Sequence, residues 1–321
     1  MRILSDETVA DLLSLDELLP VVEDAFRRQG RGAVERPERP HFPVGTDAAG
    51  EDPAGTALTM PAYLHGDNHY ATKLASVHEG NPPDRPTVQA QVVVTDARTG
   101  EPLALLAGER VTNARTGCIG GLAVRDLAAG SGPVTLGVVG AGPQARWQTR
   151  AVAAARGVSE ARIFSPSDSR ERCAADLRAD GIDARAVDSA REAVAGADAV
   201  ITATTSQEPV FPADALADGT VVVAVGAYTA EMQELDPAVF DRAEQVVADV
   251  PEEAVETGDL LAAGVTDPFP LSDVFEGTVG RTNDDEVIVV ASVGSAVLDT
   301  AAAGLLYGRA VDADAGQSVE F

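Results

Sequence analysis

The sequence predicts an α/β protein that combines a doubly wound, Rossmann-type parallel sheet with a second, mixed domain. From residue 134 onward, short apolar runs alternate with helical segments, which is typical of a parallel sheet covered on both faces. Before residue 126, strand-like runs are joined by turn residues instead. The length of 321 residues also exceeds an average domain of ~100–150 residues, so we expect two domains.

The composition is typical of a globular protein in a reducing compartment. Hydrophobic residues make up 45% of the chain, which is enough for a sizeable core. No apolar run approaches the ~18–20 residues of a membrane-spanning helix. The N-terminus turns acidic at Asp6, unlike a signal peptide. Cys118 and Cys173 supply neither a disulfide framework nor metal-site spacing. We therefore expect a cytoplasmic protein with no membrane partner.

The chain is strongly acidic, with 51 acidic and 24 basic residues and a formal net charge of −27. Such a surface repels nucleic acids and anionic membranes, so neither is an expected partner. In dilute buffer it also repels itself, whereas in molar salt the Debye length shrinks to ~3 Å and screens the repulsion. The charge therefore favours a salt-loaded cytoplasm, as in extreme halophiles, over an ordinary acidic protein.

Lysine is nearly absent from the chain, since Lys73 is the single lysine beside 23 arginines. An ammonium group can shift its pKa and pass on a proton, whereas a guanidinium stays charged. Lys73 is therefore a candidate for chemistry that arginine cannot perform.

The first 125 residues predict a helix followed by antiparallel strands. Ser14 and Glu17 have the spacing of a capping box, and the apolar residues after them have helical spacing up to Gly30. Turn residues separate the later apolar runs. The expected segments are a helix over 15–30, a loop over 31–57 with a short strand at 40–44, and strands at 68–77, 86–95 and 103–107.

The second part of the chain predicts strands that alternate with helices. The tail adds one more strand, which an Ala-rich helix follows. This tail either closes the second domain or returns to the first. The expected strands are 134–140, 161–164, 184–187, 198–204, 220–226, 244–249 and 286–294, and the expected helices are 143–156, 169–179, 189–197 and 295–310.

A dinucleotide-binding pattern, G-x-G-x-x-A, ends the strand at 134–140 and opens the next helix. The first glycine allows the tight turn, the second lets the backbone approach a pyrophosphate, and the alanine lets helix and strand pack closely. The helix N-terminus supplies N–H groups for the phosphates. The predicted cofactor-binding residues here are Gly140, Ala141, Gly142, Pro143, Gln144 and Ala145.

The next strand bears on the choice of dinucleotide. An acidic residue at its end would hold the ribose 2′-hydroxyl of NAD, but the strand ends at Ser165. Ser165, Ser167 and Arg170 suit the 2′-phosphate of NADP. Asp168 favours NAD if the loop turns it inward. We therefore expect NADP(H) to be preferred, with NAD(H) as the alternative.

Several motifs give the chain a recognisable order over almost its whole length. It resembles the ornithine cyclodeaminase/mu-crystallin family, which includes archaeal alanine dehydrogenases and ketimine or pyrroline-2-carboxylate reductases. Besides the dinucleotide pattern, the motifs are ERPHFPV (38–44), MPAY (60–63), ATKLASVHEGN (71–81), TDARTGEPLALL (95–106), TNARTG (112–117), VGAYTAEMQELD (225–236) and SVGSAVLDTAAAGLLY (292–307).

The resemblance implies a discontinuous first domain. Residues 1–125 and 287–321 would form a substrate-binding and dimerisation domain of α+β type, and the Rossmann domain, 126–286, would be inserted in it. Members of the family usually form homodimers through the first domain.

The resemblance also implies positions for the site. Arg39, Lys73 and Arg115 match the substrate pocket, where two guanidinium groups can hold a carboxylate by charge-assisted hydrogen bonds. Lys73 can also bind the carboxylate, or relay a proton at the substrate nitrogen. Thr87 matches a position near the substrate. The remaining matches lie near the cofactor: Thr116 at the phosphates, Thr204 on the adenosine side, and Val225, Gly226, Ser292 and Gly294 at the nicotinamide.

One departure from the family affects the expected reaction. Ornithine cyclodeaminases and alanine dehydrogenases of the family carry an Asp after the VGA segment, where this chain has Tyr228. Glu231 and Glu234 lie three and six residues further on, and we do not expect either to replace it. The departure favours the imine-reducing members.

We therefore predict an oxidoreductase that transfers a hydride to a C=N bond beside a carboxylate. The substrate would be a cyclic ketimine such as 1-pyrroline-2-carboxylate, or the imine of an α-keto acid and ammonia. The alternatives are ornithine cyclodeaminase and a non-enzymatic small-molecule binding protein.

The histidines invite a metal hypothesis, because all of them fall between residues 41 and 78: His41, His65, His69 and His78. A catalytic zinc site needs three well-spaced ligands, which this turn-rich segment does not offer, so we expect none. His41 or His78 either polarises the substrate or belongs to an ordinary polar rim.

Overall fold

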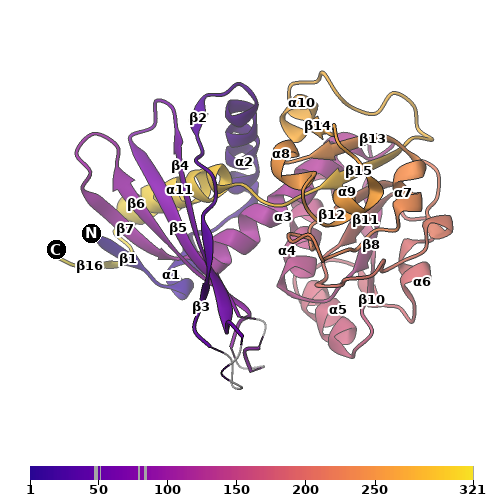
Figure 1. The fold of residues 1–321 in the computed structure, drawn as a ribbon, viewed down its shortest axis with the longest axis horizontal. Helices are drawn as coiled ribbons and strands as arrows, with labels where there is room; N and C mark the ends of the chain where they lie inside the picture. Colours follow the sequence, from indigo (N-terminus) through magenta and orange to yellow (C-terminus); the bar gives the residue numbers. More distant parts are fainter. Residues whose placement is uncertain (47–49, 51, 79, 83–84, 321) are drawn as a thin grey trace. The chain divides into compact units, whose positions relative to one another are not determined.

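The computed structural model describes residues 1–46, 50, 52–78, 80–82 and 85–320. The chain folds into two compact units, one of Met1–Arg115 with Ala296–Phe321 and the other of Thr116–Ser295. Each unit is built around a sheet of its own (Figure 1). None of the helices in the described part of the chain is both long enough and apolar enough to cross a membrane.

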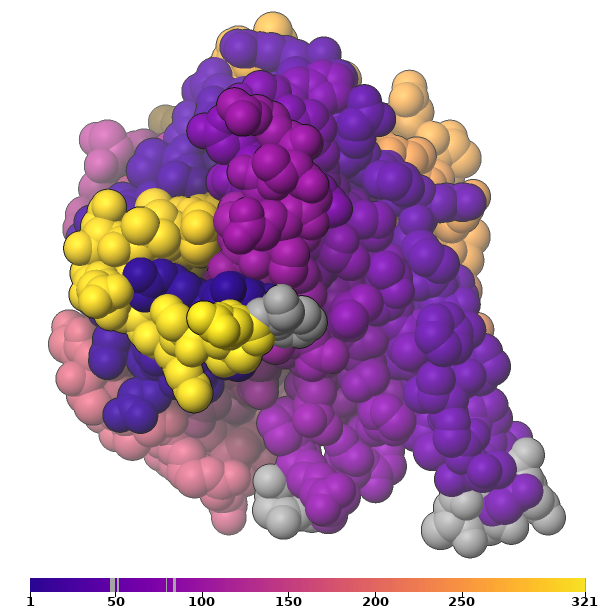
Figure 2. Space-filling model, turned by 90° about the vertical axis from the view of Figure 1, so that its left-hand side faces the viewer, coloured from indigo at the N-terminus to yellow at the C-terminus, as the bar shows by residue number. Residues whose placement is uncertain are grey.

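The strands of the first unit are β1 (Arg2–Leu4), β2 (Val34–Glu35), β3 (His41–Val44), β4 (Gly55–Leu64), β5 (His69–Val77), β6 (Val88–Asp96), β7 (Pro102–Ala107) and β16 (Gln317–Ser318). They pair in the order β16-β1-β7-β6-β5-β4-β2, and β3 also pairs with β4. The neighbours from β4 to β7 are antiparallel, as the turn residues predict. β1 pairs with β16, so the two ends of the chain lie side by side (Figure 2).

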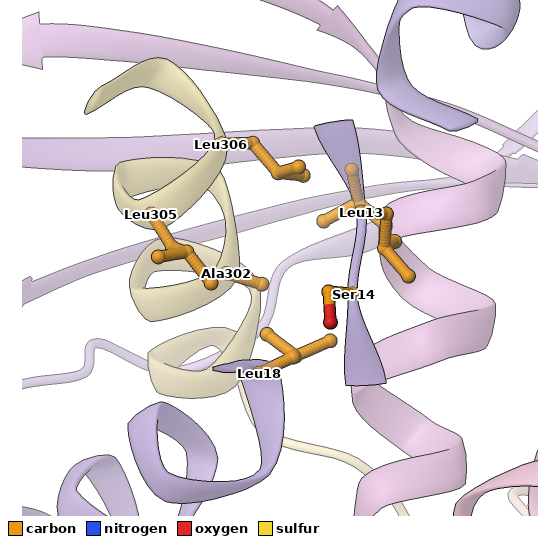
Figure 3. Close-up of a pocket in the computed structure, with 7 residues that line it drawn as sticks. Leu13, Ser14, Leu18, Ala302, Leu305 and Leu306 are labelled. Atoms are coloured by element: carbon orange, nitrogen blue, oxygen red, sulfur yellow. The ribbon is translucent and has the colours of Figure 1, made fainter. Parts of the chain in front are cut away.

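The helices α1 (Asp6–Leu12), α2 (Leu15–Gly30) and α11 (Ala296–Asp312) lie wholly within this unit. α11 packs against α2 and lies along β4, β5 and β6 (Figure 1). Leu13 and Leu18 line a small apolar pocket with Ala302 and Leu306 of α11 (Figure 3). Burial of these side chains holds α11 against α2, because each removes apolar surface from water.

The helix predicted at 15–30 is confirmed, but its expected capping box does not form. Ser14 is the N-cap of α2, yet its side chain makes no capping hydrogen bond. The side-chain cap lies one helix earlier, where the Ser5 hydroxyl accepts the Thr8 N–H at 3.2 Å. The helix α1 that this cap begins was not among the predicted segments.

The strand β4 was also missed, because its start was assigned to the loop at 31–57 and Pro61 interrupts the pattern. On its outer edge β4 pairs with β3 only up to Leu58 and with β2 only from Tyr63. Pro61 falls between these two pairings, where a missing N–H leaves no ladder hydrogen bond unmade. The short strand predicted at 40–44 is present as β3.

The second unit contains the predicted doubly wound sheet. Its strands are β8 (Val134–Val139), β9 (Val158–Phe164), β10 (Ala184–Ala186), β11 (Ala199–Thr202), β12 (Val221–Ala224), β13 (Ala243–Ala248), β14 (Phe269–Pro270) and β15 (Val287–Ala291). They run parallel in the order β10-β9-β8-β11-β12-β15-β13-β14. Strand order reverses between β8 and β11, which is where such sheets bind dinucleotides.

Short helices connect these strands: α4 (Pro143–Ala155), α5 (Ser169–Ala179), α6 (Ala190–Val194), α7 (Pro237–Asp241), α8 (Pro251–Ala254), α9 (Gly258–Ala263) and α10 (Leu271–Phe275), with a 3-10 turn at Ala213–Ala215. Figure 1 shows α4 on one face of the sheet and α6 and α7 on the other. This covering explains why β11, β12 and β15 are buried along their whole length.

The tail divides between the two units, which differs from the expected boundary at residue 287. β15 pairs with β12 and β13 inside the second sheet, whereas α11 belongs to the first unit. β15 lies in the second sheet because it is apolar throughout. All five of its residues are buried, as a strand in a parallel sheet covered on both faces requires.

The other boundary falls within a long helix that was not predicted, α3 (Gly108–Leu127), whereas the expected limit was residue 125. Its second half packs closely on α4. A Cβ on Gly117 would lie 2.7 Å from the Trp147 carbonyl oxygen, and one on Gly121 would lie 2.7 Å from that of Ala151. Glycine at both positions therefore lets the two helices touch through their backbones.

Candidate active site

A buried cluster of two cations and one carboxylate lies inside the first unit. Lys73 comes from β5, Arg115 from α3 and Asp299 from α11. Lys73 Nζ lies 2.7 Å from Asp299 Oδ2, and Arg115 Nε donates to Asp299 Oδ1 at 3.0 Å. Their exposed fractions are 3%, 4% and 1%. The structure thus brings together two of the predicted substrate residues on a carboxylate that the sequence analysis did not select.

The elements position this cluster through their side-chain periodicity. Lys73 alternates along β5 with exposed residues and shares the inward face with buried Ala71. α11 approaches that face closely at Gly304, where a Cβ would lie 2.0 Å from His69 Nε2. Asp299 stands out in the sequence of α11, since residues 296–306 contain no other charged residue. A lone carboxylate in a buried helix needs a cationic partner, and that signal could have found it.

The cluster perturbs its own proton affinities. Burial, together with the positive charges of Arg115 and Arg39, lowers the pKa of Lys73 to about 8, against the opposing charge and hydrogen bond of Asp299. Burial alone would raise the pKa of Asp299, but the charges of Arg115 and Lys73 hold it below its usual value. Asp299 is therefore an anion near neutral pH, while Lys73 can exchange its proton.

Arg39 lies close to this cluster along the sheet. The carbonyl of Pro40, the next residue, accepts the Thr59 N–H at 3.1 Å. Thr59 is followed by Met60, which is the cross-strand partner of Lys73. Arg39 is half-buried, and its charge acts on Lys73.

Thr87, in contrast, is not brought to the cluster. Its carbonyl accepts the N–H of His78, the residue that directly follows β5 and lies five residues after Lys73 along the chain. That separation is roughly 16 Å at ~3.3 Å per residue, and Thr87 is exposed.

The charges of the cluster do not cancel. Lys73 and Arg115 carry two positive charges against the single charge of Asp299. A buried excess charge is costly unless it is paired. An anionic ligand would supply the pairing, and a carboxylate matches guanidinium and ammonium donors.

In the second unit, the Gly-rich turn has the geometry of a phosphate cradle. Gly140 has a φ of +123°, and a Cβ there would lie 2.4 Å from the Ala203 carbonyl oxygen, so only glycine fits. Gly142 is the N-cap of α4, and a Cβ there would meet nothing within 4 Å. Ala145 is fully buried against the sheet. The turn therefore fits a dinucleotide pyrophosphate at the α4 N-terminus.

The next predicted residues flank this turn. Pro143 is the first residue of α4, and Gln144 follows it. Arg146 Nη1 donates a hydrogen bond to the Ala141 carbonyl at 2.6 Å. Thr116 lies beside the same helix, because its carbonyl accepts Gln148 Nε2 at 2.9 Å, and the same amide also reaches Gln144 Oε1 at 3.4 Å.

The end of β9 presents hydroxyls rather than an acid. Ser165 Oγ lies 3.1 Å from Ser169 Oγ, which lies 2.7 Å from Ser167 Oγ. Arg170 Nη1 donates to the Ser165 carbonyl at 2.9 Å. Arg170 Nε is buried and has no hydrogen-bond partner among the described residues. Asp168, the residue that would favour NAD, is exposed.

Two buried carboxylates hold the ends of the remaining strands. Glu234 accepts hydrogen bonds from the backbone N–H groups of Thr204 and Gly226 at 2.6 and 2.7 Å. The N–H of Val225, next to Gly226, donates to the Thr202 carbonyl. Glu234 is thus occupied by backbone donors, which agrees with the expectation that it does not replace the missing Asp.

The second of these carboxylates is Asp249, which follows β13. It accepts the Ser292 hydroxyl at 2.7 Å and the N–H groups of Val293 and Gly294 at 3.0 and 2.8 Å. The sequence analysis selected Ser292 and Gly294 but not the carboxylate that fixes them.

The histidines do not converge on one point. His65 pairs with Glu35 at 2.9 Å, and His78 Nδ1 lies 3.1 Å from the Ala54 carbonyl. His41 is exposed, and burial lowers the pKa of His69. Within the described residues, no group of three or more His, Cys, Asp or Glu side chains is arranged to hold a metal ion.

Comparisons with known proteins place this geometry in a family. The model of the ornithine cyclodeaminase/mu-crystallin family matches residues 1–314. The alanine dehydrogenase of Archaeoglobus fulgidus is 32% identical over 99% of this chain and 98% of its own length.

Two solved structures are similar over the whole fold. The Thermococcus litoralis Δ(1)-pyrroline-2-carboxylate reductase in complex with NADH and L-proline has a TM-score of 0.92 at 31% identity, with 99% of this chain and 100% of that chain covered. An archaeal alanine dehydrogenase dimer with bound NAD has a TM-score of 0.90 at 29% identity, with 100% and 99% covered. The chain therefore belongs to the ornithine cyclodeaminase/mu-crystallin family.

Proposed function

We propose that this protein is an NADP-preferring oxidoreductase that reduces a C=N bond next to a carboxylate. The observation that carries the proposal is the buried cluster of Lys73, Asp299 and Arg115, which has an excess positive charge. It occurs in a chain that also has a dinucleotide cradle at Gly140–Gly142. An anion-binding cluster with an exchangeable proton is what reduction of an imino acid needs beside a hydride donor.

In this proposal the substrate carboxylate binds Arg115 and Arg39. Arg115 donates to Asp299 through Nε and Nη2. These two hydrogen bonds fix the plane of the guanidinium and therefore the direction of its remaining donors. Arg39 would supply the second cation from the half-buried segment before β3. The first unit would then be the substrate-binding domain.

Lys73 would supply the proton. When bound, the reduced nicotinamide provides a hydride for the imine carbon, and the imine nitrogen must gain a proton to give the amine. With a pKa of about 8, the Lys73 ammonium can release that proton to nitrogen near neutral pH and regain it from solvent. Asp299 would hold the ammonium at the required position.

The NADP preference rests on the end of β9. The serine cluster with Ser165 and Ser167, beside the guanidinium of Arg170, suits a 2′-phosphate, whereas an acidic residue would suit the free hydroxyl of NAD. Equal kinetic efficiency with NADH and NADPH would contradict this preference.

Two substrate types remain open within the proposal: a cyclic ketimine such as 1-pyrroline-2-carboxylate, and the imine formed from an α-keto acid and ammonia. The names of the relatives support both, since they include a pyrroline-2-carboxylate reductase and alanine dehydrogenases. The exposed Tyr228 stands where both the cyclodeaminases and the alanine dehydrogenases of the family carry an Asp. It supports reduction over ornithine cyclodeamination and, between the two substrate types, favours the cyclic ketimine.

The test is NADPH absorbance in molar KCl with product analysis. The substrates are 1-pyrroline-2-carboxylate, then pyruvate with ammonium, then ornithine. NADPH loss with the cyclic imine, or with pyruvate and ammonium, would support the proposal and choose between its two forms. Proline from ornithine without net NADPH loss would show a cyclodeaminase instead, and tight NADPH binding without any turnover would favour a binding protein.

A homodimer is part of the proposal. The face of the first sheet opposite α11 carries uncharged residues on its central strands, including Thr59, Tyr70, Leu74 and Val93. Tyr70 and Leu74 are exposed. In a chain with a net charge of −27, an uncharged, partly apolar face suits contact with a second copy.

A further inference from the structure

Glu234 is a buried carboxylate that joins two strand ends. Its exposed fraction is 0%. Oε1 accepts the Thr204 N–H at 2.6 Å, while Oε2 accepts the Gly226 N–H at 2.7 Å and the Thr202 hydroxyl at 2.9 Å. Both oxygens are therefore used, and one side chain ties the end of β11 to the end of β12.

The two strand ends are also in direct backbone contact. A Cβ on Gly226 would lie 2.1 Å from the Thr204 carbonyl oxygen and 2.6 Å from Glu234 Cδ. The backbone after β12 therefore fits only against Glu234 and the turn after β11, with no side chain between them.

The position of Glu234 in the sheet points to one half of a dinucleotide. The Gly-rich turn and the serine cluster follow β8 and β9, on one side of the point where strand order reverses. The partners of Glu234 end β11 or follow β11 and β12, on the other side. Thr204 therefore lies on the side opposite the Gly-rich turn, and not on the adenosine side that the family resemblance implies for it. In doubly wound sheets each side holds one nucleotide, and the 2′-phosphate position at Ser165 assigns the adenosine to the β8–β10 side.

We infer that Glu234 is a positioning residue for the nicotinamide half of the cofactor, acting through the backbones of Thr204 and Gly226. This inference rests on the proposed function, because it takes the ligand to be a nicotinamide dinucleotide. Glu234 does not touch the cofactor in this account. It keeps two strand ends at the spacing that receives the second nucleotide.

The arrangement requires an ionised carboxylate. Three donors converge on its two oxygens, so a proton on either oxygen places a donor against a donor. Burial, together with the negative charge of Asp259, raises the pKa of Glu234 to about 7, against the opposing effect of the hydrogen bonds from Thr204 and Gly226. Asp259, on α9, accepts the N–H groups of Glu234 and Leu235. A protonated fraction therefore exists near neutral pH.

The test compares two ligands and two matched variants. In Glu234→Gln, an NH₂ group replaces one accepting oxygen, so NADPH should bind roughly 10-fold more weakly, as for one mispaired buried hydrogen bond. The fragment 2′,5′-ADP lacks the nicotinamide half and should keep its affinity within about 2-fold. Both dissociation constants are measured by calorimetry in molar KCl.

The control is Asp259→Asn, which removes a neighbouring buried charge in the same way. Asp259 uses only Oδ1, for both N–H groups, at 2.7 and 2.8 Å. The amide keeps that oxygen, so NADPH affinity should stay near that of the wild type. A second measurement needs no variant: between pH 8.5 and pH 6, wild-type affinity for NADPH should fall more than affinity for 2′,5′-ADP, and this difference should vanish in Glu234→Gln.

Three results would overturn the inference. Unchanged NADPH binding in Glu234→Gln, with the wild type binding both ligands, would overturn it alone. Equal loss of both ligands, together with equal pH dependence of both in the wild type, would show that Glu234 supports the whole domain and not one half of the site. A wild type that bound neither ligand would overturn the proposed cofactor, and the inference with it.

Discussion

At the scale of single residues, Asp299 decides what Lys73 can do. Its carboxylate raises the pKa of Lys73 against burial and against the charges of Arg115 and Arg39. Lys73 must be protonated to supply a proton, so the rate of imine reduction should fall as pH rises through about 8. This direction follows because the lysine loses its proton above its pKa.

The variant Asp299→Asn tests this coupling. It removes the charge that favours the ammonium, so the alkaline limb of the pH–rate profile should move to lower pH. It also leaves two buried cations without their partner, which should destabilise the fold by ~3–5 kcal/mol. The exposed pair of Asp6 and Arg110 supplies the control, because Asp6→Asn should change stability by at most ~1 kcal/mol. An alkaline limb that stays in place in Asp299→Asn would contradict the coupling.

The residue scale also shows the limits of sequence reasoning. Lys73 and Arg115 were found because a lone lysine and a family motif mark them. Asp299 was not found, although it is the only charged residue in 296–306, because the family motif that contains it was interpreted only for its cofactor positions. Thr87 was placed by motif alone, and the register of β5 and β6 puts it beyond reach of Lys73.

At the scale of elements, the contact between α3 and α4 depends on glycine. Gly121→Ala would place a Cβ 2.7 Å from the Ala151 carbonyl oxygen, and overpacking of this kind costs ~1–3 kcal/mol. Gly308, an exposed residue of α11, has nothing within 4 Å of its added Cβ. There the same substitution should stabilise by ~0.5–1 kcal/mol, because alanine favours helix.

Urea unfolding of Gly121→Ala and Gly308→Ala measures the two changes in the free energy of unfolding, which should have opposite signs. A Gly121→Ala protein as stable as the wild type would mean that α3 and α4 are not in backbone contact.

The elements differ in how well the sequence predicts them. Most strands of the second sheet are continuous apolar runs, and they were predicted within a few residues, as were the helices α4, α5 and α6. The short elements α7 to α10 and β14 were not predicted, because four to six residues are too few to show a helical period and β14 has only two residues. β4 and α3 were not predicted, for different reasons. Pro61 breaks the pattern of a strand whose outer edge is locally unpaired, and α3 mixes glycines with apolar residues on several sides, which hides its helical period.

At the scale of the whole molecule, the net charge of −27 predicts a dependence on salt. Repulsion among acidic groups should destabilise the protein in dilute buffer and fade as the Debye length falls toward ~3 Å at 1 M salt. The midpoint of thermal unfolding should therefore rise steadily from low salt to molar KCl. Full activity and an unchanged midpoint after dialysis to low salt would contradict the high-salt setting expected from the charge.

The uncharged face of the first sheet predicts the oligomeric state. Leu74→Asp places a charge among the exposed residues of that face and should convert the proposed dimer into a monomer. Leu261→Asp, at an exposed site on α9 of the other unit, should leave the dimer intact. Light scattering after size-exclusion chromatography in molar KCl measures both, and a Leu74→Asp protein that stayed dimeric would move the interface elsewhere.

The central claim is that Lys73 supplies the proton when a C=N bond beside a carboxylate is reduced. Its most direct test is the rate of NADPH oxidation with 1-pyrroline-2-carboxylate, measured for the wild type and for Lys73→Arg in molar KCl. Because a guanidinium stays charged, kcat/KM should fall by roughly 100-fold or more, while NADPH binding stays unchanged. The surface variant Arg110→Lys should keep the wild-type rate. A Lys73→Arg enzyme with a near-normal rate would contradict the account.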